Sequence, residues 1–160
     1  MGKRLIQQRR GRGTPRYRAP SHRYEGAVKH YAMQTSGMVT DLIHCAGHSA
    51  PLMEVAYLTG ERGLSFAPDG IRVGDEVAVG GAEVKVGNVL PLRDIPEGTL
   101  IHNIELQPLD GGKLVRASGS SARVVSKTDD AVRVLLPSKK EKLFQPGCRA
   151  AIGVLAGSGR

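Results

Sequence analysis

The sequence predicts an all-β protein, in which two small barrels follow an extended basic N-terminal arm. Short runs of alternating apolar residues are separated by turns rich in Gly, Pro and Asp, which is typical of strands. No window of a dozen residues keeps the apolar stripe of an amphipathic helix. Residues 1–24 carry eight Lys and Arg and no acid, so this stretch cannot form a core of its own.

The first set of predicted strands lies within residues 53–86. Apolar residues alternate at Met53, Val55 and Tyr57 and again at Leu64 and Phe66. Shorter alternating pairs follow at 71–73, 77–79 and 84–86, each bounded by glycine-containing turns. These closely spaced strands favour a small barrel.

A second set of predicted strands covers residues 99–106, 122–124, 132–136 and 148–154. Between the two sets, Pro91 and Pro96 predict a rigid connector, with helix confined to one turn at 92–95. The predicted organisation is therefore an arm at 1–35, a barrel at 36–84 and a second barrel at 85–160.

Charge is distributed unevenly along the chain, whose formal net charge is +8. Residues 41–112 hold 11 acids and 4 bases, whereas residues 1–24, which are called the arm from here on, carry eight cations and no acid. Seven of the eight arm cations are Arg, which favours bidentate phosphate contacts over simple solvation. We expect the arm to bind RNA through Lys3, Arg4, Arg9, Arg10, Arg12, Arg16, Arg18, His22 and Arg23.

Alternatives for the arm remain open at this point. An anionic membrane surface would require an apolar face, for which only Leu5 and Ile6 are available, so we expect no membrane partner. Tyr17, Tyr24 and Tyr31 lie in or beside the arm, where they could stack on unpaired bases or pack the arm onto the body.

A second candidate RNA contact is the acid-free segment Gly111–Arg123. It combines small residues and hydroxyls with three cations, so its backbone N–H groups could approach a phosphate closely. The predicted RNA-binding residues here are Lys113, Arg116, Ser118 and Arg123.

His44, Cys45 and His48 form the pattern H-C-x-x-H, which could supply zinc ligands or a reactive thiol. The spacing is unlike that of common zinc sites, and neighbouring residues do not aim a base at a nucleophile. We therefore expect no metal, no cofactor, no small-molecule substrate and no enzymatic activity, with Cys148 in an alternating core strand.

Nine blocks of residues along nearly the whole chain occur together in one order. They are Arg9–Thr14, Arg18–Tyr24, Ala67–Gly70, Val73–Glu76, Gly87–Leu92, Ile95–Thr99, His102–Glu105, Gly112–Gly119 and Cys148–Gly153. In residues and in order these blocks resemble the family of large-subunit ribosomal protein two, in its shorter archaeal and eukaryotic form, which is more specific than any single motif. Arg149, in the last block, completes the set of candidate RNA-binding residues.

The resemblance implies an OB-fold barrel followed by an SH3-like barrel. It implies a structural constituent of cytoplasmic ribosomes that binds large-subunit rRNA and neighbouring ribosomal proteins, with a possible contact to the small subunit. Support of subunit association and of the peptidyl-transferase region is implied as well. The alternative is a free RNA-binding regulator or RNA chaperone.

The family is expected to continue into a long basic tail, which this sequence lacks after Arg160. A tail histidine is associated with the peptidyl-transferase region, and we expect none of the five histidines here to take that role.

Overall fold

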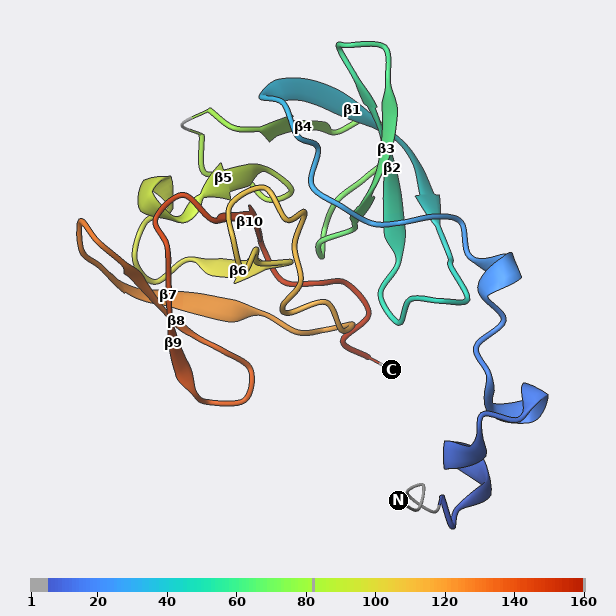
Figure 1. Ribbon diagram of the computed structural model, residues 1–160. Coiled ribbons are helices and arrows are strands. Elements are labelled where there is room, and N and C mark those ends of the chain that lie inside the picture. The colour runs from blue at the N-terminus through green and yellow to red at the C-terminus, as the bar shows by residue number, and fades with distance from the viewer. Residues whose placement is uncertain (1–5, 82, 160) are drawn as a thin grey trace.

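The protein is built on one sheet of ten strands, described by a computed structural model covering residues 6–81 and 83–159. The strand order is β3-β2-β1-β4-β5-β10-β6-β7-β8-β9 (Figure 1). The predicted all-β class is therefore confirmed. No described helix is long and apolar enough to cross a membrane.

The first four strands form the half that follows the arm. The long strand β1 pairs with both β2 and β4, and a bulge between Val39 and Asp41 bends it. Their bounds are β1 Thr35–Ile43, β2 Leu52–Tyr57, β3 Arg62–Phe66 and β4 Glu76–Val79.

The remaining strands form the second half, which the last strand closes by inserting between β5 and β6. A short parallel pairing of Val79 with Val89 joins β4 to β5 and makes the two halves one sheet. The bounds are β5 Val89–Pro91, β6 Leu100–His102, β7 Ala122–Lys127, β8 Val132–Leu135, β9 Glu141–Phe144 and β10 Arg149–Ile152.

The strand predictions failed in two places of the first half. Residues 71–73 lie between Gly70 and Gly74, whose φ angles of 86° and 91° turn the chain at both ends. Residues 84–86 likewise end at Gly87, with φ 94°, and form no strand. Val73, Val84 and Val86 are therefore left as exposed apolar side chains.

Three strands were not predicted: β5, which lies in the segment predicted as a rigid connector, and β1 and β9, whose sequences do not alternate cleanly. The strand β1 carries exposed Met38, Asp41 and Leu42, and β9 buries only Phe144. Both are held by backbone pairing to a better-patterned neighbour, which a search for apolar periodicity does not detect.

Three apolar clusters fill the described part of the molecule. The largest lies in the second half and includes Leu90, Ile101, Val134 and the predicted core residue Cys148. A second fills the first half, to which β10 contributes Ala151. In the third, Leu155 from the end of the chain packs with Phe66 and Cys45, so residues distant in sequence share one core.

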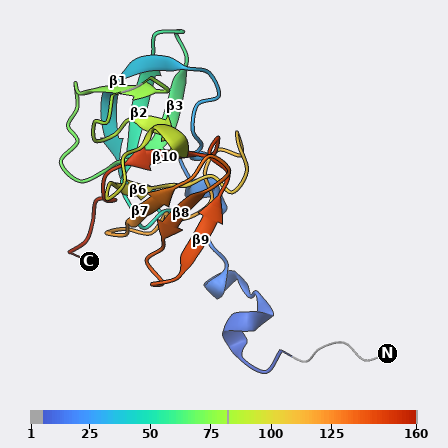
Figure 2. The ribbon, with the colours of Figure 1, turned by 90° about the vertical axis from the view of Figure 1, so that its left-hand side faces the viewer.

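The arm extends away from this body (Figures 1 and 2). It is not uniformly extended, because three short 3₁₀ turns interrupt it: η1 (Arg9–Arg12), η2 (Pro15–Tyr17) and η3 (Ser21–Arg23). The turn predicted at 92–95 is also present, as η4 (Leu92–Asp94), ahead of Pro96. None of the arm turns buries a residue, in keeping with the arm's lack of a core.

Replacing Leu90 by alanine should lower the free energy of unfolding by about 2–5 kcal/mol, because a fully buried leucine would leave a cavity. The matched change Leu143→Ala, at a side chain 61% exposed, should cost less than about 0.5 kcal/mol. Urea unfolding of both variants measures the difference. Equal losses would contradict the assignment of Leu90 to the core.

Candidate nucleic-acid interface

The predicted arm cations lie on a fully exposed surface. Arg9, Arg10, Arg12, Arg16, Arg18, His22 and Arg23 are all exposed. Lys3 and Arg4 lie outside the described residues. Arg12 donates from its Nε to the carbonyl of Ile6 at 3.4 Å, and no described arm residue forms an ion pair with an acid. The guanidinium groups of the described arm are therefore available to bind an external anion.

The three tyrosines near the arm have separate positions. Tyr24 lies on the backbone of Gly47, where an added Cβ would come within 2.6 Å of its ring, and its ring is tilted against His48. Tyr31 stacks on Tyr57 with ring centroids 4.3 Å apart. Tyr24 and Tyr31 therefore pack on protein, whereas Tyr17 remains 47% exposed.

Residues 25–34, which we call the strap, connect the arm to β1 across the second half of the molecule. The N–H of His30 donates to the carbonyl of Gly111 at 3.0 Å, and its Nε2 lies 2.6 Å from the carbonyl of Asn103. Arg116 donates to the carbonyl of Val28 at 3.2 Å. These contacts place the base of the arm beside the Gly111–Arg123 segment.

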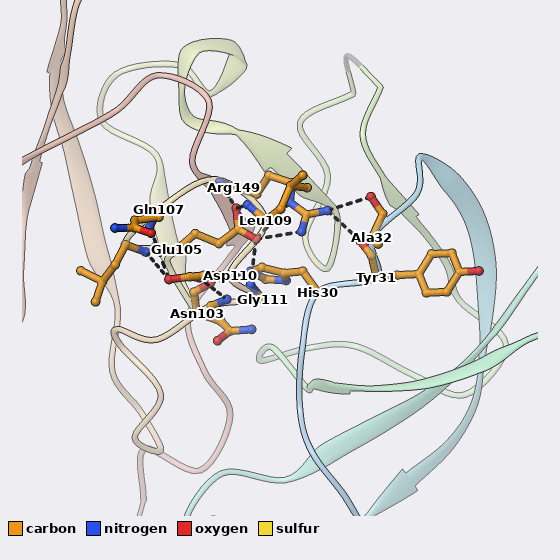
Figure 3. Close-up of polar contacts among 12 residues, drawn as sticks. His30, Tyr31, Ala32, Asn103, Glu105, Gln107, Leu109, Asp110, Gly111 and Arg149 are labelled. Atoms are coloured by element: carbon orange, nitrogen blue, oxygen red, sulfur yellow. Dashed lines mark hydrogen bonds and ion pairs between the residues drawn. The ribbon is translucent and has the colours of Figure 1, made fainter.

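Arg149 completes this attachment from inside the protein. Its Nη1 donates to the carbonyl of Tyr31 at 2.6 Å, while its Nη2 forms an ion pair with Glu105 at 2.8 Å (Figure 3). The Arg149 side chain is only 9% exposed. Sequence reasoning assigned this residue to RNA, but the structure places its guanidinium between Glu105 and the strap.

The carboxylate of Glu105 is the centre of the network in Figure 3. It is fully buried and accepts hydrogen bonds from the N–H groups of Leu109, Gly111 and Arg149 and from two guanidinium nitrogens of Arg149. Burial alone would raise the pKa of Glu105. The hydrogen bonds and charge of Arg149 outweigh burial, and the pKa is lowered.

The backbone around the Glu105 network has an unusual conformation. Asn103, Leu109 and Val115 adopt positive φ angles of 47°, 68° and 56° without being glycine. Such a conformation is unfavourable for a β-branched residue such as Val115. The surrounding hydrogen bonds, including that from the N–H of Asn103 to the carbonyl of Val115, hold the loop in place.

The Gly111–Arg123 segment is divided between the interior and the surface. Lys113 and Arg123 are exposed. Arg116 is half-buried, with its guanidinium 5.0 Å from the Phe66 ring centroid and bound to the strap. The N–H of Ser118 donates to the Ser49 hydroxyl at 3.2 Å.

The backbone of this segment is largely engaged within the protein. The N–H groups of Gly111, Gly112, Lys113, Leu114, Ser118, Gly119 and Ser120 all donate to internal acceptors. The expected cradle of N–H groups for a phosphate is therefore not formed by these donors. In this segment, the exposed side chains of Lys113 and Arg123 are the groups that remain available to bind a polyanion.

The H-C-x-x-H pattern folds into a local contact. His48 Nδ1 lies 3.2 Å from Cys45 Sγ, and Cys45 is buried in the cluster that contains Phe66. Among residues 6–81 and 83–159, no three His, Cys, Asp or Glu side chains are grouped in a way that could hold a metal ion.

A β-sheet body with a long, acid-free arginine arm is the architecture of a protein that assembles on a polyanionic scaffold such as RNA. Comparison with known proteins agrees. Residues 85–160 match the family described as Ribosomal Proteins L2, C-terminal domain.

Similarity to named relatives covers the whole chain. The chain is 50% identical to the large ribosomal subunit protein uL2 of Methanococcus maripaludis strain C6, over 100% of this chain and 70% of the relative. It is also 50% identical to the uL2 protein of Methanococcus vannielii, over 100% of this chain and 71% of the relative. The chain therefore belongs to the uL2 family of ribosomal proteins, as the resemblance predicted.

Replacing Glu105 by glutamine should destabilise the protein by about 3–5 kcal/mol, because the buried guanidinium of Arg149 would lose its counter-charge. The control is Glu54→Gln at the Arg62 pair, whose side chains are 26% and 69% exposed and whose loss should cost at most about 1 kcal/mol. Chemical denaturation measures both. A Glu105 variant as stable as the Glu54 variant would refute the central role of the pair.

Acid should destabilise the protein below about pH 6.5. Burial lowers the pKa of His30 and of His102 from 6.5 to about 4, so both are neutral in the folded protein at pH 7. The unfolded chain binds these protons first as pH falls from about 6.5 to 4, so stability is full above this window and declines through it, by roughly 1.4 kcal/mol per pH unit for each histidine.

The decline is measured by urea unfolding at several pH values. His30→Asn should reduce the slope between pH 6.5 and 4 relative to the parent. Parallel slopes for the parent and the His30 variant would show that His30 does not contribute.

Proposed function

We propose that this chain, a structural constituent of the large ribosomal subunit, binds large-subunit rRNA through its arm and through Lys113 and Arg123. The observation that carries the proposal is the exposed arm, whose described arginines have no acidic partner within the protein. Its place of action is the ribosome.

The chemistry of the arm suits RNA phosphates. Each guanidinium presents a planar fork of donors that matches two phosphate oxygens. The arm's 3₁₀ turns bury nothing, so RNA would supply the contacts that fix it. Tyr17, the exposed aromatic of the arm, is available to stack on an unpaired base.

The strap gives this binding a structural consequence. Because His30 and Tyr31 are bound to the second half, rRNA held by the arm is positioned relative to both halves of the body. We propose that the protein supports subunit association and the peptidyl-transferase region by fixing RNA in this way, in a structural and not a chemical role. Contacts with neighbouring ribosomal proteins and with the small subunit belong to the same proposal.

The alternative of a free RNA-binding regulator is not favoured. The similarity to large-subunit proteins covers the whole chain and includes the arm as well as both halves of the sheet. A regulator that shared only the barrels would not require the arm to match.

Replacing Arg9, Arg10, Arg12, Arg16 and Arg18 by alanine should weaken rRNA binding and flatten its salt dependence. Each phosphate contact contributes roughly 0.7 to the slope of log affinity against log salt on single strands, so three or four lost contacts lower it by roughly 2–3. Filter binding to a large-subunit rRNA fragment over a series of salt concentrations measures the slope.

Lys139→Ala with Lys140→Ala provides the control, because these exposed lysines lie in the β8–β9 turn and outside the proposed interface. This double variant should retain the parent slope. An unchanged slope in the arm variant, with binding otherwise intact, would show that the arm does not contact phosphates.

A further inference from the structure

A groove lined by carboxylates follows the chain that joins β4 to β5. Two hollows of about 320 Å³ and 140 Å³ meet at Lys85. Asp69, Asp75 and Val86 line the first, and Glu76 and Glu83 line the second. We call these five residues and Lys85 the acidic groove.

The charge of the acidic groove is opposite to that of the whole chain. Four carboxylates and one lysine line the two hollows, in a protein whose formal net charge is +8. None of the four forms an ion pair within residues 6–81 and 83–159. Because phosphates are repelled by unpaired carboxylates, this surface is unsuited to an RNA backbone.

The groove also exposes apolar side chains that the sequence predicts in strands. Val84 and Val86 are 42% and 44% exposed, and nearby Val73 is 57% exposed. Beyond Val86, a third hollow of about 410 Å³ has Leu100 and Ile152 in its lining. Carboxylates beside exposed apolar surface are typical of a protein-binding site, since both kinds of group gain from an appropriate partner.

The groove lies away from the proposed RNA-binding arm. Both views of the ribbon show the β4–β5 connection on the opposite side of the body from the arm (Figures 1 and 2). A partner on this connection would therefore not compete with RNA for the arm.

We propose that the acidic groove binds an extended, Lys- and Arg-rich segment of a neighbouring protein in the large subunit. The aliphatic stems of such side chains would cover Val86, while their charged ends reach Asp69, Asp75, Glu76 and Glu83. A flexible basic segment that orders on binding can follow a narrow groove. This inference rests on the proposed function, because it places the partner within the ribosome.

The test is photocrosslinking within intact large subunits that carry Val86→p-benzoylphenylalanine. The expected product joins position 86 to a ribosomal protein, and the crosslinked peptide, identified by mass spectrometry, is rich in Lys and Arg. A crosslink to rRNA, a crosslink to a neutral or acidic peptide, or no crosslink at all would each overturn the proposal.

Two matched variants test the charge. In the position-86 background, Asp69→Lys should reduce the yield of the protein crosslink about fivefold by turning an attraction into a repulsion. Asp130→Lys, the same change at an exposed aspartate in the β7–β8 turn, should leave the yield unchanged. Equal yields in the two variants would overturn the electrostatic basis of the proposal.

A separate probe distinguishes a failure of the groove proposal from a failure of the proposed function. Tyr17→p-benzoylphenylalanine in the same subunits should crosslink to rRNA, since Tyr17 is exposed on the arm. Failure at position 17 with a basic peptide at position 86 would contradict RNA binding by the arm and leave the groove proposal standing. The reverse pattern would contradict the groove alone.

Discussion

The buried ion pair between Glu105 and Arg149 fixes the relative positions of three parts of the protein. Glu105 belongs to the loop after β6, Arg149 begins β10, and the same guanidinium binds the strap at Tyr31. A buried carboxylate is stable only when its oxygens are satisfied, and Glu105 accepts five hydrogen bonds. The loop must therefore fold around it, in keeping with the positive φ angle at Leu109, whose N–H donates to Glu105.

This arrangement binds the strap to the second half in space, although the strap precedes the first half in sequence. The strap crosses the loops that contain Asn103 and Gly111 before the chain enters β1. In the opposite direction, Leu155 returns from the second half to pack with Phe66 and Cys45. Two chain crossings and one parallel strand pairing thus join the halves, so an anion bound by the arm is held in a defined relation to both.

Basic and acidic residues are separated along the sequence, and in the folded protein they also lie on different surfaces. The arm's exposed arginines have no carboxylate partner in the described protein, and Lys113 and Arg123 are exposed as well. Carboxylates of the acidic middle segment line the β4–β5 connection instead. The two charges therefore lie on different faces of the protein, so that a polyanion is attracted to one face and a cationic partner to the other.

The sequence by itself determined the all-β class, most strand positions, the cationic arm and the family. Each of these depends on local pattern: alternation at Val132 and Val134, turn residues such as Pro68-Asp69-Gly70, and the run of arginines without acids. Such patterns are written in neighbouring residues and need no knowledge of distant contacts.

Only the tertiary structure decided which cations are exposed and which are bound inside the protein. In sequence, Arg149 and Arg116 are indistinguishable from Arg123, yet Arg149 meets Glu105, Arg116 binds Val28, and Arg123 faces outward. Likewise Tyr24 and Tyr31 pack on Gly47 and Tyr57, while Tyr17 stays exposed. The physical reason is that a charged group or an aromatic ring contacts partners dozens of residues away in the sequence, and only the folding of the chain brings those partners together.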